Sequence, residues 1–278
     1  MRIVALMNQK GGVGKTTTTV NLGVALARAG QRVCILDLDP QAHSTTYLGL
    51  EQDADQISVY DCLTRGVPLA DVRRDVERNL SLIPSHINLA GAEVELAGAV
   101  GREVLLRDLF EADDEPLDFV LMDCPPSLGV LTLNALTAAG EVFVPLQPHY
   151  LALHGMSKLF ETVQLVARRL NPKLLISGII VCLYETGTRL SAEVVNDLEQ
   201  FLKSAQTAAR QAPWTNARIY QTRIRRNIRL AESASFGQSI FDYEPSSPGA
   251  RDYHSLALEV IGAPAPAFVF PEAQTGAA

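Results

Sequence analysis

The sequence predicts an α/β fold, a doubly wound, mostly parallel sheet with helices on both of its faces. Three observations support it: short apolar strands alternate with helical segments, a glycine-rich loop joins the first strand to the first helix, and two later strands end in aspartates. Strands separated by helices favour parallel pairing, because each crossover helix returns the chain to the same edge of the sheet. We expect one domain over residues 1–263 and a flexible tail, rich in alanine and proline, over residues 264–278.

The composition is that of an ordinary soluble globular protein, with 47% hydrophobic and 20% charged residues in a chain of 278. No apolar run approaches the roughly 18 residues that cross a membrane, and the chain opens on a strand-like segment, so we expect no signal peptide and a cytoplasmic location. The four cysteines form no C-x-x-C pair, which favours reduced, buried thiols over disulfides or a zinc site. The net charge of −7 argues against indiscriminate nucleic-acid binding by the protein as a whole.

The first strand and the first helix flank a loop with the chemistry of a phosphate-binding site. We expect the strand over residues 3–7 and the helix over residues 18–29, with residues 9–17 between them. Glycines let backbone N–H groups close around phosphate oxygens, and the start of the helix adds a favourable dipole. In this pattern Lys15 reaches the terminal phosphates and the Thr16 hydroxyl ligates Mg²⁺.

The spacing of this loop departs from the ordinary phosphate-binding pattern at its first residue. That pattern has a glycine five residues before Gly14, where this chain has Gln9, and a second lysine, Lys10, follows. The alternative is a glycine-rich turn with two solvated lysines, which the flanking strand and helix patterns disfavour.

Two aspartates close the second strand, which is expected over residues 33–36. Asp37 and Asp39 are two residues apart, so their side chains point the same way if the strand continues. Open α/β sheets bind ligands at the carboxyl ends of their strands, so both carboxylates are candidates to face a nucleotide. An ordinary strand-ending turn is the alternative, because Asp and Pro both favour turns.

A later apolar strand, over residues 119–123, ends in Asp123 and is followed by Pro125 and Pro126. This is the form of a Walker B strand, in which a buried strand carries an acid to the shell of a Mg²⁺ ion, usually through a bound water. The prolines cannot continue the strand and fix a stiff loop beside the terminal phosphate. We therefore expect Asp123 to act at the metal together with Thr16.

The remaining segments complete the alternation. Periodicity and apolar runs predict strands over residues 80–84, 142–146 and 174–183, and helices over residues 57–63, 128–139, 153–170 and 190–202. Residues 90–110 favour helix but contain Gly98 and Gly101, which predicts two helices or one broken helix. The acidic cluster over residues 111–115 is expected to be a solvated loop.

One segment of this acidic protein is strongly basic. Residues 200–231 contain no acid and carry seven basic side chains, of which five are arginines between positions 218 and 229. The pattern predicts a patch that neutralises DNA phosphates, with an affinity that depends on salt and not on base sequence. The alternative is that some of these arginines contact the nucleotide or pair with acids elsewhere, such as Glu232.

Three motifs occur together in this chain: residues 10–17, residues 36–41 around the first two aspartates, and residues 122–126 around Asp123. Together they resemble the deviant Walker ATPases, and within these the ParA family of DNA-partitioning P-loop ATPases of the Soj-like chromosomal type. Residues 224–237, with Gly249, Ala250 and Tyr253, are similar to the stretch that follows the last strand in that family. The resemblance covers about residues 1–262.

The resemblance implies a role for each residue of the nucleotide site. Lys10 is the signature lysine, which crosses a dimer interface to touch the ATP of the other subunit, and Asp39 positions the attacking water, with Asp37 a second candidate. Catalysis is implied for Lys10, Lys15 and Asp39, and metal binding for Thr16 and, through water, for Asp123. ATP and Mg²⁺ are the implied cofactors, held by Lys10, Gly11, Gly12, Val13, Gly14, Lys15, Thr16, Thr17, Asp37 and Asp123. ATP would hold a sandwich homodimer together until hydrolysis releases it.

The resemblance also implies that the ATP-bound dimer binds double-stranded DNA without sequence preference. Arg226 and Arg229 match the basic run of the family, and Arg189, Arg223 and Arg225 are further candidates. The family often has proline where Arg225 stands, and it commonly has its other arginine nearer to Gly187 than Arg189 is. The implied partner is a ParB-like or adaptor protein that stimulates slow hydrolysis, and the implied location is the cytoplasm, on the nucleoid. The helix-turn-helix extension of larger relatives is not expected, which argues against operator-specific repression.

Other functions of related ATPases are weaker alternatives. A membrane-surface positioning ATPase of the MinD kind would need a basic amphipathic helix at its C-terminus, whereas residues 264–278 contain no Lys or Arg. A reductase similar to the nitrogenase iron protein would need two well-placed cysteines per subunit for a bridging cluster, and only Cys124 is near the nucleotide motifs. An ATP-dependent ligase is a further metabolic alternative.

Overall fold

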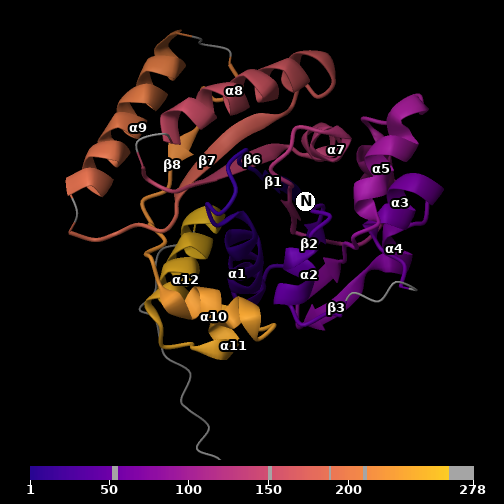
Figure 1. Ribbon diagram of the computed structural model, residues 1–278, viewed down its shortest axis with the longest axis horizontal. Coiled ribbons are helices and arrows are strands. Elements are labelled where there is room, and N and C mark those ends of the chain that lie inside the picture. The colour runs from indigo at the N-terminus through magenta and orange to yellow at the C-terminus, as the bar shows by residue number, and fades with distance from the viewer. Residues whose placement is uncertain (52–55, 150–151, 188, 209–211, 263–278) are drawn as a thin grey trace, which may run out of the picture.

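The computed structural model describes residues 1–51, 56–149, 152–187, 189–208 and 212–262, so the predicted tail lies outside the described residues. Within them the fold is built on one sheet of eight strands in the order β3-β4-β2-β5-β1-β6-β7-β8 (Figure 1). The strands are β1 Arg2–Leu6, β2 Val33–Asp37, β3 Arg74–Glu77, β4 Leu80–Ile83, β5 Phe119–Asp123, β6 Glu141–Leu146, β7 Leu175–Val181 and β8 Arg218–Ile219. Every neighbouring pair is parallel except β3 with β4, which confirms the predicted doubly wound, mostly parallel sheet.

Helices cover both faces of this sheet. They are α1 Lys15–Arg28, α2 His43–Tyr47, α3 Val59–Arg65, α4 Leu69–Val72, α5 Leu89–Glu95, the 3₁₀ turn η1 Leu96–Gly98, α6 Leu105–Glu111, α7 Val130–Ala138, α8 Ala152–Arg169, α9 Arg189–Ala208, α10 Ile228–Ser235, α11 Ile240–Tyr243 and α12 Pro248–Ile261. Helices α1, α10, α11 and α12 pack on one face, while α3 and α5 to α9 pack on the other (Figure 1). Within the described segments, no helix has the length and apolar character needed to cross a bilayer.

The central strands are mostly apolar because they face a core on both sides, whereas the edge strand β3 is polar and only partly buried. In β1 the side chains of Val4 and Leu6 join the core under α1 and α12, whereas Ala5 joins the opposite core. Adjacent side chains of a strand point to opposite faces, so a strand buried on both faces has no polar alternation. The nucleotide loop follows β1, which lies between β5 and β6 near the middle of the sheet.

The acidic cluster over residues 111–115 was predicted to be a solvated loop, and this prediction is wrong for Asp113. Asp113 and Arg73 form an ion pair whose side chains are only 7% and 9% exposed, and Glu115 lies farther from the same guanidinium, at 3.8 Å. Arg73 comes from the turn before β3, an antiparallel edge strand that the sequence pattern did not predict. A buried ion pair needs a partner distant in the chain, and composition near position 113 does not identify that partner. Residues 90–110 form two helices, as one of the two predicted options had it.

Candidate nucleotide site and basic segment

The loop after β1 has the backbone that glycine permits. Gly12 and Gly14 have φ values of +72° and +91°, in the left-handed region that other residues adopt only with strain. Gly14 precedes the first turn of α1, which begins at Lys15, three residues before the predicted start. No side chain caps this helix terminus. Its first N–H groups therefore suit an anionic ligand better than they suit an apolar one.

The two lysines of the loop lie in different environments. Lys15 is 8% exposed, and its charge acts on the buried Asp123. Lys10 is exposed, its backbone N–H donates to Asn8 Oδ1 at 3.0 Å, and its Nζ contacts Nε2 of His149. Partial burial, and then the charge of Lys10, lower the pKa of His149. The loop thus directs one ammonium into the protein and leaves the other at its surface.

Two of the predicted carboxylates meet at adjacent strand ends. Asp37 ends β2 and Asp123 ends β5, and the two residues are direct partners in the parallel register. Both are almost completely buried. Burial raises the pKa of Asp37, and the neighbouring Asp123 raises it further. Burial also raises the pKa of Asp123, against the lowering effects of the Thr16 and Ser44 hydroxyls and of Lys15.

A short helix that the sequence did not predict, α2, holds both carboxylates. Ser44 Oγ donates to Asp123 Oδ2 at 2.8 Å, while the backbone N–H and the hydroxyl of Thr45 donate to Asp37 Oδ2 at 2.9 and 2.8 Å. The polar residues directly after the motif over residues 36–41 were the available signal for this helix, because Ser and Thr hydroxyls favour local hydrogen bonds at helix starts.

One oxygen of Asp123 has no partner in the described structure. Asp123 Oδ1 is buried, yet no donor contacts it. An unpaired buried carboxylate oxygen is costly, so such an atom usually has a ligand or a water as its partner. The Thr16 hydroxyl is close enough to lower the pKa of the same carboxyl. A threonine hydroxyl and a carboxylate acting through water suit Mg²⁺, which prefers oxygen ligands and retains several of its waters.

Asp39 lines a pocket of about 490 Å³ beside the loop. Asp39 Oδ1 accepts the backbone N–H of Gln41 at 3.0 Å, and this turn leads into α2. The pocket is lined by Gly12, Gly14, Lys15, Thr16, Thr17, Asp39, Gln41, His43, Pro126 and Leu183. The structure therefore brings together five predicted loop residues, Asp39 and Gln41 of the same aspartate motif, and it adds His43 and Leu183, which no sequence motif included. Val13, a residue of the same loop, is buried.

The predicted DNA-contact arginines differ in how firmly the fold holds them. Arg225 is bound to Asp252 of α12 by its side chain, at 2.6 Å for the closest pair, and by its backbone N–H at 3.0 Å. Arg223 lies over the ring of Tyr184, with its guanidinium carbon 4.8 Å from the centroid. These two side chains already serve to fix the segment between β8 and α10.

Arg226 and Arg229 are more exposed. Arg226 pairs with Glu185 at 3.1 Å with a side chain that is 65% exposed, and Arg229 pairs with Glu232 at 2.7 Å with a side chain that is 49% exposed. The second pair is the one that the sequence offered as an alternative to DNA contact. Arg189 is the first residue of α9, and its side chain lies outside the described residues.

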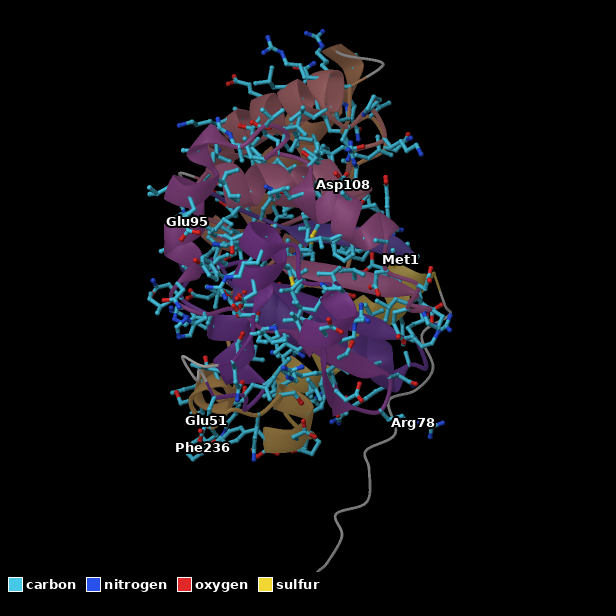
Figure 2. All side chains as sticks on the ribbon, turned by 90° about the vertical axis from the view of Figure 1, so that its right-hand side faces the viewer. Met1, Glu51, Arg78, Glu95, Asp108 and Phe236 are labelled. Carbon is cyan, nitrogen blue, oxygen red and sulfur yellow. The ribbon has the colours of Figure 1, made fainter. Side chains whose placement is uncertain are left out.

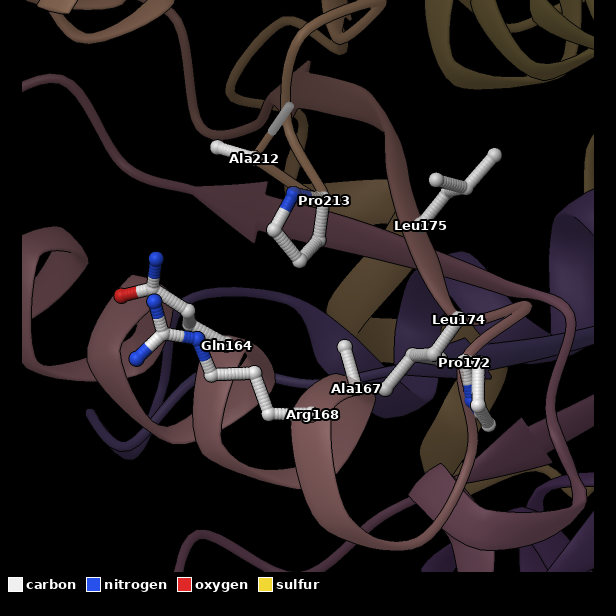
Figure 3. A pocket seen from close by; sticks show the side chains of 8 residues that line it. All are labelled: Gln164, Ala167, Arg168, Pro172, Leu174, Leu175, Ala212 and Pro213. Atoms are coloured by element: carbon white, nitrogen blue, oxygen red, sulfur yellow. The ribbon is translucent and has the colours of Figure 1, made fainter. Parts of the chain in front are cut away.

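A separate pocket of about 430 Å³ lies between α8 and the start of β7 (Figure 3). It is lined by Gln164, Ala167, Arg168, Pro172, Leu174, Leu175, Ala212 and Pro213. None of these residues belongs to a predicted motif, and the pocket lies at the end of β7 opposite to the nucleotide loop. It therefore forms no part of the candidate nucleotide site.

Comparison with known proteins agrees with this geometry. Residues 1–176 match the family model described as an AAA domain. The chain is 42% identical over 260 residues to the sporulation initiation inhibitor protein Soj of Bacillus subtilis, covering 93% of this chain and 98% of Soj. It is 40% identical over 264 residues to the chromosome partitioning protein ParA of Caulobacter vibrioides, covering 94% of each. A crystal structure of cobyrinic acid a,c-diamide synthase from Mycobacterium smegmatis with bound ADP and magnesium is 34% identical, with a TM-score of 0.78 and 94% of each chain covered. The chain belongs to the Soj/ParA family of chromosome-partitioning ATPases.

Proposed function

We propose that this protein is an ATPase that dimerises around ATP, binds DNA without sequence preference in that state, and so partitions a chromosome, a plasmid or another large cargo. The observation that carries the proposal is the divergence of the two loop lysines, Lys15 into the site and Lys10 at the surface. A surface lysine at the mouth of a phosphate loop can reach a nucleotide held by a second copy of the chain. The site would then be complete only in the dimer.

ATP and Mg²⁺ fit the residues of the site. The left-handed glycines and the uncapped start of α1 offer N–H groups to the phosphates, and Lys15 offers its charge. Thr16 would hold Mg²⁺ directly and Asp123 through a water, at the carboxylate oxygen that has no other partner. When bound, Mg²⁺ supplies charge neutralisation at the β- and γ-phosphates.

Hydrolysis requires a positioned water more than it requires covalent chemistry. Asp39 lines the pocket and is held by the turn to Gln41, which suits it to orient that water. Asp37 is buried behind it and bonded to Thr45, so we assign Asp37 the support of α2 rather than direct contact with water. With Lys10 supplied only by the partner, hydrolysis is slow until the dimer forms.

DNA binding is assigned chiefly to Arg226 and Arg229. Both are exposed, and their carboxylate partners Glu185 and Glu232 are partly exposed, so exchange of each pair for a phosphate costs little. Arg223 and Arg225 contribute by shaping the segment, and Arg189 stays a candidate. A ParB-like or adaptor protein would stimulate hydrolysis, and the dimer would reside on the nucleoid.

The experiment measures binding of the full-length protein to duplex DNA of arbitrary sequence with ATP, with ADP and without nucleotide, while light scattering follows dimerisation. We expect DNA binding and dimers only with ATP and Mg²⁺. Lys10→Ala is expected to bind ATP and fail to dimerise, and Arg226→Ala to dimerise and bind DNA weakly. Equal DNA binding with and without ATP would contradict the proposal.

Two alternatives have direct assays. The ligase named by the 34% identical structure would show ATP turnover that depends on a carboxylate acceptor, with no effect of DNA. A membrane-surface ATPase would co-sediment with liposomes in ATP. The segment that would carry such an anchor, residues 264–278, lies outside the described residues.

A further inference from the structure

Helix α2 contacts the nucleotide site at one end and α10 at the other. Its second and third residues, Ser44 and Thr45, bond to Asp123 and Asp37. Its last residue, Tyr47, is 2% exposed and extends its hydroxyl between α1 and α10. A helix of five residues has little freedom to bend between these two sets of bonds, so displacement of one end moves the other.

The hydroxyl of Tyr47 joins three helices. It accepts from Asn21 Nδ2 of α1 at 3.0 Å, donates to the carbonyl oxygen of Leu230 in α10 at 3.0 Å, and lies 2.9 Å from Ser233 Oγ of the same helix. Asn21 and Ser233 are fully buried. The side chains of Tyr47, Asn21 and Ser233 do not line the nucleotide pocket, although Asn21 also donates to the carbonyl oxygen of Thr17. Nothing in the proposed chemistry accounts for this network.

A second contact joins the same two regions just beyond the helices. A Cβ placed on Gly237, which follows α10, would lie 3.1 Å from the Cα of Gly49, which follows α2. Figure 2 shows Glu51, two residues after Gly49, and Phe236, next to Gly237, at the same end of the molecule. Backbone contact at one place and a buried hydrogen-bond network at another fix α2 against α10.

Helix α10 carries Arg229, and Arg226 lies two residues before its start. A series of contacts thus links the carboxylates of the nucleotide site, through α2 and α10, to the arginines assigned to DNA binding. We infer that Tyr47 couples nucleotide binding to the DNA-binding segment by transmitting the position of α2 to α10. This inference rests on the proposed function for its DNA readout, but the movement of α10 can be measured without DNA.

Coupling between two sites is reciprocal in binding free energy. If Tyr47 carries it, ATP strengthens DNA binding and DNA strengthens ATP binding by one and the same factor, and loss of the hydroxyl reduces both. The variant Tyr47→Phe is suited to the test, because Leu230 O retains a bond from Ser233 Oγ at 3.2 Å and Asn21 Nδ2 retains Thr17 O at 2.9 Å. No buried group loses its last partner.

The first measurement compares DNA affinity with ATP and with ADP. For Tyr47→Phe we expect ATP-dependent dimers as in the wild type, with the ATP-to-ADP ratio of DNA affinities reduced by about tenfold, within the usual range of coupling factors. Tyr253→Phe is the matched control, since it removes another buried tyrosine hydroxyl, bonded to Thr18 at 3.1 Å, outside the α2–α10 network. It is expected to keep the wild-type ratio. A wild-type ratio in Tyr47→Phe, or loss of dimerisation together with DNA binding, would overturn the inference.

The second measurement separates this inference from the proposed function. Hydrogen exchange of the α10 amides is followed with and without a non-hydrolysable ATP analogue and Mg²⁺. We expect the analogue to change exchange in α10 of the wild type and of Tyr253→Phe, and to leave it unchanged in Tyr47→Phe and in Ser233→Ala. If the wild type binds no DNA, the proposed function fails while this result still decides the coupling. An α10 that responds equally in the wild type and in both network variants would contradict it.

Discussion

The nucleotide loop and the arginine segment were both identified from side-chain patterns, but they differ in what decides their behaviour. In the loop, the glycines and lysines are neighbours in sequence, and local backbone geometry separates Lys10 from Lys15. In the arginine segment, the partners come from elsewhere: Asp252 from α12 and Glu185 from the turn after β7. A motif with fixed spacing therefore predicts the local geometry of a site. A run of basic residues predicts only a local excess of positive charge, and the fold decides which arginines form internal ion pairs and which lie exposed at the surface.

The largest effect is expected inside the loop. Lys15→Ala removes a charged group that faces the phosphates and Asp123, so the dissociation constant for ATP should rise about 100-fold or more. Lys10→Ala should change the ATP affinity of the isolated chain far less, because its side chain lies outside the pocket lining. Calorimetric titration with ATP at a protein concentration too low for dimers measures both. Equal losses would remove the distinction between the two lysines.

Within the arginine segment, Arg225→Ala should act on stability. Its loss leaves the buried carboxylate of Asp252 without its side-chain partner, at a cost of about 1–2 kcal/mol because the arginine itself is partly exposed. Denaturant unfolding gives the free energy, and Arg226→Ala is the matched control, with an expected change below about 0.5 kcal/mol. If Arg225→Ala were as stable as the wild type and bound DNA poorly, Arg225 would be a DNA contact and not a structural residue.

Arg226→Ala and Arg229→Ala should act on DNA affinity and leave folding intact. Each should weaken binding about fivefold, equally for all sequences, and lower the slope of log affinity against log salt by about one. Fluorescence anisotropy with labelled duplexes at several salt concentrations supplies both numbers. An unchanged slope would show that the arginine keeps its carboxylate partner in the complex.

The smallest effect concerns His149 beside Lys10. Partial burial and the lysine charge lower the pKa of His149, so the folded state binds fewer protons than the unfolded state. Stability should therefore fall as pH drops below the ordinary histidine value of about 6.5. The His149→Gln variant should lack this part of the pH-dependent loss of stability, which amounts to less than about 0.5 kcal/mol in the free energy of unfolding. Melting curves of the two proteins between pH 8 and about pH 5.5 test it, and parallel curves would contradict it.

The sequence predicted those features that depend on neighbouring residues. The loop, the aspartates at the ends of β2 and β5, and the central strands followed from spacing and apolar runs, and the structure places Asp37 and Asp123 side by side. The roles of these residues in ATP chemistry stay predictions. Features that depend on distant partners were missed: Arg73 beneath Asp113, Ser44 on Asp123, and Tyr47 on Leu230. Each joins segments that are 40 or more residues apart, and such pairings are invisible to a local pattern.

The central claim is that Lys10 serves the site of the other protomer, and mixing two inactive variants tests it. Lys10→Ala keeps Asp39 and Lys15, while Asp39→Ala keeps Lys10, so a mixed dimer has one complete site only if Lys10 acts across the interface. We predict that each variant alone hydrolyses almost no ATP and that an equal mixture recovers up to about half of the wild-type rate, because each mixed dimer has one complete site out of two and Lys10→Ala forms no dimers with itself. A mixture as inactive as its components would contradict the account.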